Sequence, residues 1–251
     1  MLIILFLVLF SLSPTLQANA LEVVFEHNPP FQMIDGGQNG YGPVFEFANK
    51  LIKYADIQAH FNGKPWARII RKEAFLPNKL ILSMSKTPQR TPKFIWLISV
   101  YEGQQYIWKK KNAIDPHNKK LTVSLERDSH KIKSINAYFK PENVFKFLNS
   151  AQALDALMQE RVQRFVGTTF AVSGKLASLG YTLADVEQMS VFDEGHLASQ
   201  GLYLALTLGT DSQIIEALES ALQHPEIIKA RNSLFNNFLE AEKKLLAIQS
   251  R

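Results

Sequence analysis

Strand-like and helix-like segments alternate along the first part of the chain, and this alternation restricts the chain to few folds. Residues 21–25 (LEVVF) are rich in β-branched and aromatic side chains, which favour a strand. Pro43 opens a segment whose apolar residues recur at helical spacing, and Pro65 opens another. Residues 79–85 (KLILSMS) are the next strand-like run. The alternation predicts an α/β fold with a mainly parallel sheet.

The same alternation starts again after a long extended segment. Residues 94–111 are apolar and aromatic, and Gly103 interrupts them. Residues 120–125 (KLTVSL) then begin a second series of strands and helices, and residues 200–208 (QGLYLALTL) form a second extended run. We therefore expect two α/β lobes joined by two extended connections. The predicted division places residues 21–100 in the first lobe, 101–198 in the second, and 199–251 in a return to the first with the C-terminal helices.

The first twenty residues have the pattern of a secretory signal. An apolar run extends from Leu2 to Phe10, which is shorter than the roughly 20 apolar residues that a bilayer-spanning helix needs. Small residues at positions 18–20 (ANA) suit cleavage after Ala20. No Lys or Arg precedes the run, which departs from the usual pattern, and a buried N-terminal strand is the alternative. The segment predicts a signal peptide over residues 1–20 and a periplasmic protein.

Composition narrows the chemistry. The chain has no cysteine, which excludes disulfides, thiolate metal sites and a cysteine nucleophile. None of the six histidines has a close partner at metal-ligand spacing. The net charge is +5 with scattered lysines, and we interpret the densest cluster, residues 109–111, as a solvated turn. We expect no metal, no cofactor, no catalytic residues and no nucleic-acid partner.

A row of hydroxyl side chains ends in an arginine. Ser83, Ser85 and Thr87 stand at alternate positions, and Arg90 follows. The planar guanidinium matches a carboxylate with two parallel hydrogen bonds, and hydroxyls supply further donors. The row therefore suggests that Ser85, Thr87 and Arg90 converge on one anionic group. The alternative is a helix N-terminus capped by Thr87 with Arg90 in a surface salt bridge, and local physics does not choose between the two.

Two aromatic residues occupy positions where ligands bind in α/β proteins. Phe31 follows two prolines after the first strand, and Trp66 follows Pro65. Ligands of open α/β sheets bind in the crevice outside the carboxyl ends of the strands. Either aromatic could instead belong to the core.

The segments PPF (29–31), GYGPVFEFANKL (40–51), PWARII (65–70) and LSMSKTPQR (82–90) together resemble the first lobe of the family 3 extracellular solute-binding proteins. These are the periplasmic receptors of polar amino-acid ABC importers. The resemblance implies a two-lobed type II periplasmic-binding-protein fold with two crossover strands that closes on its ligand. It places Ser85, Thr87 and Arg90 on the family's row that grips the ligand α-carboxylate. It also places Phe31 and Trp66 where the family stacks aromatic side chains on the ligand.

The second lobe departs from the family pattern. Where the family has a G-T-G-S turn, this chain has ERDS and keeps only Ser129. Gln163 replaces an aspartate, and Thr168 stands about where the family binds the ligand's amino group with an aspartate. A buried ammonium group needs an anionic or fully hydrogen-bonded partner, so the departure leaves amino-acid binding open. Glu194, with Asp193, is a substitute near the second crossover.

These observations predict a periplasmic solute-binding protein, not an enzyme. It would capture a small carboxylate ligand, an amino acid or a related molecule, by lobe closure, and present it as a monomer to an inner-membrane ABC permease. The alternatives are a sensor or accessory protein that has lost ligand binding, and a dehydratase-like enzyme on the same fold that uses Glu194 or His196. The predicted ligand-binding residues are Phe31, Trp66, Ser83, Ser85, Thr87, Arg90, Ser129, Thr168 and Glu194.

Overall fold

The computed structural model of the chain describes residues 20–35, 39–117, 120–193, 195, 198–199 and 201–249. Apart from Ala20, the predicted signal peptide lies outside the described residues, as does Glu194. Within the described part of the chain, no helix has both the length and the apolar character that crossing a bilayer requires.

In the first sheet, the strands on one side pair in parallel and the strands on the other side pair antiparallel. Its strand order is β4-β1-β5-β12-β6, and β1 pairs in parallel with both of its neighbours. β12 enters antiparallel between β5 and β6, so a late segment of the chain completes the sheet. The strands are β1 (Leu21–Phe25), β4 (Ala59–Gly63), β5 (Lys79–Ser85), β6 (Phe94–Tyr101) and β12 (Leu202–Thr207).

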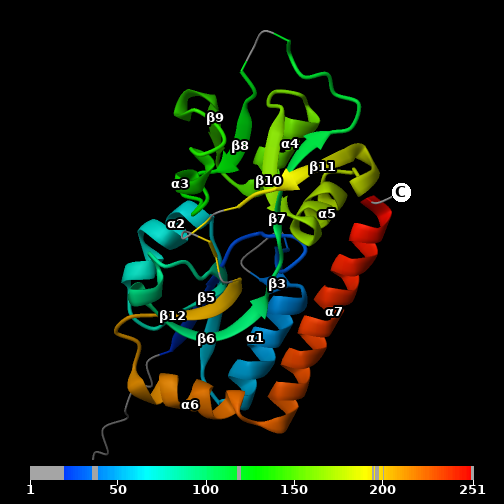
Figure 1. The fold of residues 1–251 in the computed structure, drawn as a ribbon. Coiled ribbons are helices and arrows are strands. Elements are labelled where there is room, and N and C mark those ends of the chain that lie inside the picture. Colours follow the sequence, from blue (N-terminus) through cyan, green and yellow to red (C-terminus); the bar gives the residue numbers. More distant parts are fainter. Residues whose placement is uncertain are drawn as a thin grey trace, which may run out of the picture.

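Helices and a short hairpin surround this sheet (Figure 1). Pro43 is the first residue of α1, and Pro65 directly precedes α2, which confirms both predicted helix starts. Proline suits these positions because the first helical N–H groups have no partner within the helix. The elements are β2 (Met33–Ile34), β3 (Gly40–Tyr41), α1 (Pro43–Tyr54), α2 (Trp66–Arg71), η1 (Glu73–Phe75), η2 (Thr91–Lys93), α6 (Ser212–Leu222) and α7 (Pro225–Gln249).

The second sheet has the strand order β11-β7-β10-β8-β9. β8 pairs in parallel with β9 and β10, and β7 pairs antiparallel with β10 and β11. The strands are β7 (Gln105–Lys110), β8 (Val123–Glu126), β9 (Val144–Phe147), β10 (Arg164–Thr168) and β11 (Val186–Val191). The helices are α3 (Ile132–Ile135), η3 (Pro141–Asn143), α4 (Ser150–Met158), α5 (Thr169–Ser178) and η4 (Leu183–Asp185).

The chain passes between the two sheets twice. It leaves the first sheet after Tyr101 and joins the second at Gln105. It leaves the second sheet after Val191 and rejoins the first at Leu202. Each sheet has its own hydrophobic core, so the molecule consists of two α/β lobes, and the predicted fold class is confirmed.

The last helix, α7, contacts both lobes. It contributes Ile227, Leu234 and Phe238 to the core of the first lobe. Near its end, Leu245 packs against the core of the second lobe. Figure 1 shows α7 running along one side of the molecule from α6 to α5.

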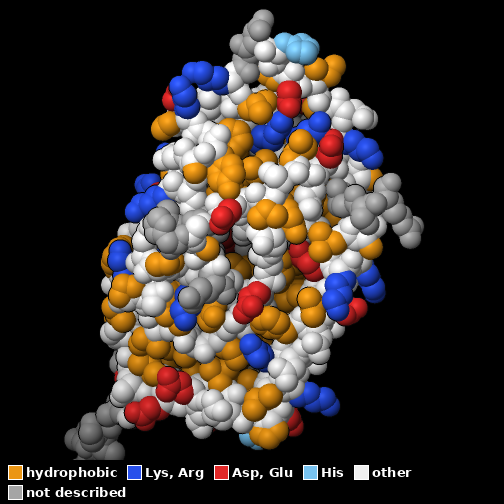
Figure 2. Space-filling model, viewed as in Figure 1, with side chains coloured by type: hydrophobic (Ala, Val, Ile, Leu, Met, Phe, Trp, Pro, Cys, Tyr) orange, Lys and Arg blue, Asp and Glu red, His pale blue; other side chains and the backbone are white. Residues whose placement is uncertain are grey.

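Basic side chains are scattered over the face shown in Figure 2. The interpretation of residues 109–111 as a turn is wrong for the first two. Lys109 and Lys110 belong to β7, and they form ion pairs with Glu187 at 3.2 Å and Glu160 at 2.7 Å.

Candidate functional site

A cavity of about 140 Å³ lies between the two lobes. Residues at the ends of β1, β5, β8 and β10 line it, together with the first crossover and α5. The carboxyl ends of parallel strands from both sheets therefore converge on one cleft, the arrangement in which α/β proteins bind small ligands.

Arg90 points into this cavity. Its Nη1 donates to the backbone oxygen of Ser85 at 3.2 Å, and its guanidinium lies 5.1 Å from the centre of the Trp66 ring. Among the described residues, no carboxylate oxygen lies within 4.0 Å of the guanidinium. Burial lowers the pKa of Arg90 to about 10, against the opposing charges of Glu126 and Glu26. The group therefore stays positively charged at neutral pH.

The hydroxyl row divides into two groups. Ser83 and Ser85 line the cavity, whereas Thr87 is buried and does not. The hydroxyl of Ser83 donates to Oε1 of Gln32 at 2.6 Å, and Ser83 has a φ of 51°, a local irregularity within β5. The backbone oxygen of Thr87 accepts from the N–H of Arg90 at 2.9 Å, which forms the turn that positions the arginine.

Both predicted aromatic residues line the cavity and also belong to the core. Phe31 is 1% exposed and packs with Tyr101, Phe170 and Phe238, with ring centres 4.8–5.6 Å from its own. Trp66 packs in a second cluster on the other side of the first sheet. The sequence left a choice between site and core, and the geometry allows both roles.

Both predicted residues of the second lobe that the structure describes reach the cavity. Ser129 lines it, and its hydroxyl accepts from the N–H of Lys131 at 3.3 Å. Thr168 lines it as the N-cap of α5, with its hydroxyl accepting from the N–H of Ala171 at 3.2 Å. The hydroxyl of Thr168 is neutral, so it does not supply the negative charge that would pair with a ligand's ammonium group.

The structure adds two acidic residues that the sequence analysis missed. Glu26 directly follows β1, and Glu126 is the last residue of β8, so they come from opposite lobes. Both are partly exposed and line the cavity, so two carboxyl groups from opposite lobes lie in one space. Phe31 and Trp66 were predicted because they lie where a strand ends. Glu26 and Glu126 also lie where strands end, so the same criterion could have identified them.

Burial favours the protonated form of both glutamates. Burial raises the pKa of Glu26 to about 7, although Lys175, Glu126 and Arg90 act in the opposite direction. Burial and the adjacent Glu26 raise the pKa of Glu126 well above its usual value. Two carboxylates in one cavity repel each other, which disfavours the doubly charged form.

Cationic groups of the second lobe face the same cavity. Lys175 of α5 is buried, and its Nζ donates to Oδ1 of Asn28 at 2.8 Å and to the oxygen of Pro29 at 3.2 Å, both in the first lobe. Burial lowers the pKa of Lys175 to about 8, and the glutamates oppose this effect. Nζ of Lys131 donates to the oxygen of Val166 at 3.1 Å. Lys175 therefore links the lobes while remaining mostly charged at neutral pH.

Comparison with known proteins identifies the fold. No family model and no curated protein sequence matches the chain. Among solved structures, a histidine kinase sensor domain with similarity to periplasmic binding proteins aligns over 88% of this chain and 96% of its own, with a TM-score of 0.70 and 13% identity. The chain therefore has the two-lobed fold of periplasmic binding proteins.

Other structural neighbours are amino-acid receptors, as the resemblance of the first lobe predicts. An ancestral arginine-binding protein bound to glutamine aligns over 87% of this chain and 97% of its own, with a TM-score of 0.67 and 19% identity. An amino-acid ABC transporter substrate-binding protein from Streptococcus pneumoniae, bound to L-arginine, aligns over 89% and 95%, with a TM-score of 0.68 and 14% identity.

Proposed function

We propose that this protein is a solute-binding protein that captures a small carboxylate ligand between its lobes and delivers it to an ABC importer. The observation that carries the proposal is the position of Arg90. Its guanidinium faces the cavity, stacks on Trp66, and has no carboxylate of the described residues within 4.0 Å. A charge-assisted hydrogen bond to such a group contributes about 1.5–3 kcal/mol.

The size of the cavity supports a small ligand. Its volume of about 140 Å³ lies below the roughly 300 Å³ at which pockets for drug-sized molecules begin. A molecule with the dimensions of an amino acid or a short organic acid fits this limit. Of the predicted ligand-binding residues that the structure describes, those that line the cavity are Phe31, Trp66, Ser83, Ser85, Arg90, Ser129 and Thr168.

Contacts across the cleft support capture by lobe closure. Lys175 of the second lobe binds backbone and side-chain oxygens of the first. Nη2 of Arg71 in α2 donates to Oδ1 of Asp128, which follows β8, at 2.8 Å. Each contact exists only while the lobes are close together, so a ligand that bridges the lobes would stabilise the same arrangement. Export to the periplasm and presentation to a permease belong to the same proposal.

Thermal denaturation with a panel of amino acids and simple organic acids tests this function. A ligand at 100 times its dissociation constant stabilises the folded protein by about 2.7 kcal/mol. We expect Arg90→Ala to abolish the stabilisation, and Arg90→Lys to weaken it because lysine lacks the planar fork. Arg161→Ala, at an exposed site, is the control and should respond like the wild type. A ligand that stabilises Arg90→Ala fully would contradict the proposal.

A second candidate function is a ligand-sensing domain. The arrangement of α7, which packs against the cores of both lobes, favours it. One structural neighbour is a histidine kinase sensor domain. A receptor that releases its ligand to a permease should change its radius of gyration on binding, as measured by small-angle X-ray scattering, whereas an unchanged radius favours a sensor. The dehydratase alternative rested on Glu194 and His196, which lie outside the described residues.

A further inference from the structure

Two buried acceptor atoms of the second lobe have no donor within the protein. Oε1 of Glu126 and Oε1 of Gln105 are shielded from solvent, and neither has a hydrogen-bond partner among the described residues. Both residues line the cavity between the lobes. A buried acceptor that lacks a donor is unfavourable, and such atoms are rare in folded proteins. The two oxygens therefore mark places where a ligand can supply hydrogen-bond donors.

The two acceptors lie on either side of Thr168 in the second sheet. β10, which ends at Thr168, is the strand between β7 and β8. Gln105, the first residue of β7, pairs with Thr168, and Glu126 is the last residue of β8. All three residues thus lie at the same end of three neighbouring strands. Gln105 and Glu126 are two strand spacings apart, about 10 Å, and two long side chains can span this with one small group between them.

The acceptors lie on the opposite lobe from the arginine of the cavity. Arg90 enters from the first lobe, and no carboxylate oxygen of the described residues lies within 4.0 Å of its guanidinium. Glu126 enters from the second lobe with one carboxylate oxygen unpartnered. A molecule with a carboxylate at one end and a cation that carries N–H groups near it would meet a complementary group on each lobe.

We infer that the ligand is a small zwitterion whose ammonium group donates to Glu126 and Gln105 while its carboxylate binds Arg90. The inference rests on the proposed function, because Arg90 binds the carboxylate in both. In the family that the first lobe resembles, an aspartate at about the position of Thr168 binds the amino group. Here the acceptors come from the strands on either side. Glu126 is the first residue of the ERDS segment, where the family has a glycine, so the family pattern does not assign it this role.

The lysines of the second lobe do not take the place of this ammonium group. Nζ of Lys131 donates to the oxygen of Val166 at 3.1 Å, and Nζ of Lys175 donates to Oδ1 of Asn28 at 2.8 Å. Burial raises the pKa of Glu126 well above its usual value, and a cation beside the carboxyl group would act against that rise. The unpartnered oxygens need donors, so a primary ammonium group suits them and a trimethylammonium group does not.

Isothermal titration calorimetry with matched probes near neutral pH tests the inference. L-alanine and propionate, L-glutamate and glutarate, and L-arginine and 5-guanidinopentanoate each share a carbon skeleton and differ in the α-ammonium group. In the set that binds best, we expect the amino acid to bind at least about tenfold more tightly than its deamino partner, a difference of about 1.4 kcal/mol. The N-trimethyl derivative of that amino acid should lose the advantage.

Variants of the two acceptors locate the amino-group site. Glu126→Gln removes the negative charge and Gln105→Leu removes the amide oxygen, so each should reduce the preference for the amino acid, in Glu126→Gln to less than about threefold. Glu219→Gln, at an exposed site on α6, is the control and should keep the wild-type preference. The probe comparison uses the wild-type protein alone, so it decides the ligand class even if a cavity variant folds poorly.

The possible results distinguish this inference from the proposed function. A deamino acid that binds as tightly as its amino acid, with dependence on Arg90, would overturn the inference and leave the proposed function intact. A preference that survives in Glu126→Gln but is lost in Glu26→Gln would also overturn the inference. Failure of every amino acid to bind would do the same, and failure of the deamino acids as well would overturn the proposed function. Full affinity in Arg90→Ala would overturn the proposed function too.

Discussion

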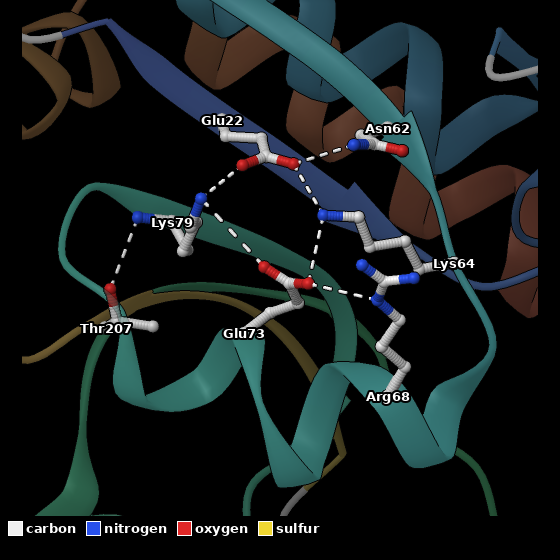
Figure 3. Close-up of polar contacts among 7 residues, drawn as sticks. All are labelled: Glu22, Asn62, Lys64, Arg68, Glu73, Lys79 and Thr207. Carbon is white, nitrogen blue, oxygen red and sulfur yellow. Dashed lines mark hydrogen bonds and ion pairs between the residues drawn. The ribbon is translucent and has the colours of Figure 1, made fainter.

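At the scale of single residues, a network of ion pairs joins β1 and β5 of the first sheet to α2 and η1 (Figure 3). Glu22 of β1 accepts from Nδ2 of Asn62 at 2.8 Å, from Nζ of Lys64 at 2.7 Å, and from Lys79. Glu73 is buried beside it and lies 3.1 Å from Nζ of Lys64. Burial alone would raise the pKa of Glu22, but the hydrogen bonds from Lys64, Lys79 and Asn62 lower it to about 2.

Removal of Lys64 should therefore destabilise the first lobe. Lys64→Met leaves two carboxylates with fewer cations, and we expect a cost of about 3 kcal/mol, the lower end of the range for a broken buried pair. The lowered pKa of Glu22 contributes stability that is present above its ordinary value of 4.5 and is lost as the pH falls toward 2. Urea denaturation at pH 7 and pH 3 measures both effects.

The variant should also lose less stability than the wild type between pH 7 and pH 3, because Glu22 then has a more ordinary pKa. Lys53→Met, at an exposed position on α1, is the control. Equal stability of the Lys64 and Lys53 variants would show that the network contributes nothing measurable.

At the scale of elements, α7 holds the two lobes through one turn of helix. Phe238 packs against Tyr101 of the first lobe and Phe170 of the second, with ring centres at 5.7 and 5.0 Å. Oε2 of Glu242 accepts from the hydroxyl of Tyr101 at 2.9 Å and from the N–H of Phe170 at 3.1 Å. Two side chains one turn apart thus contact the same pair of residues from opposite lobes.

Neighbouring residues on α7 provide a matched test of this element. Phe238 is 4% exposed and Leu239 is 52% exposed. We expect Phe238→Ala to lower the free energy of unfolding by about 3–5 kcal/mol, because it leaves a cavity among packed rings. Leu239→Ala should cost less than about 1 kcal/mol. Chemical denaturation measures both, and similar costs for the two variants would contradict the assigned role of α7.

At the scale of the whole molecule, the lobes approach most closely where α5 meets the loop after β1. Gly174 of α5 faces Pro30, and a Cβ atom at this position would lie 2.4 Å from Cδ of Pro30. The adjacent Lys175 makes its cross-lobe hydrogen bonds at the same contact. The absence of a side chain at one helical position therefore permits the lobes to come together.

Gly174→Ala should separate the lobes without unfolding them. Alanine is the better helix former by about 1 kcal/mol, so α5 itself should be stabilised, while the contact with Pro30 can no longer form. We expect a larger radius of gyration in small-angle X-ray scattering and an affinity for the ligand lower by at least about tenfold, or about 1.4 kcal/mol. Ala177→Ser, at an exposed site on α5, is the control. Unchanged scattering and affinity would show that this contact does not limit closure.

The limits of sequence reasoning are visible in particular elements and residues. The sequence analysis assigns no strand to β9 or β11, which form the two edges of the second sheet. Their side chains are largely exposed, so they lack the apolar alternation that marks a half-buried strand. The position of Arg90 could be predicted because the arginine and the hydroxyl residues before it lie within eight consecutive residues. The role of Glu194 stays a prediction, because that residue lies outside the described part.

The sequence alone determined the alternation of strands and helices, the helix starts at Pro43 and Pro65, and the arginine after β5, because short-range spacing and backbone restrictions determine them. Only the tertiary structure decided that Glu26 and Glu126, one hundred positions apart, line the same cavity. Their proximity comes from the packing of two separately folded lobes. No local pattern records the burial that raises the pKa of both carboxyl groups.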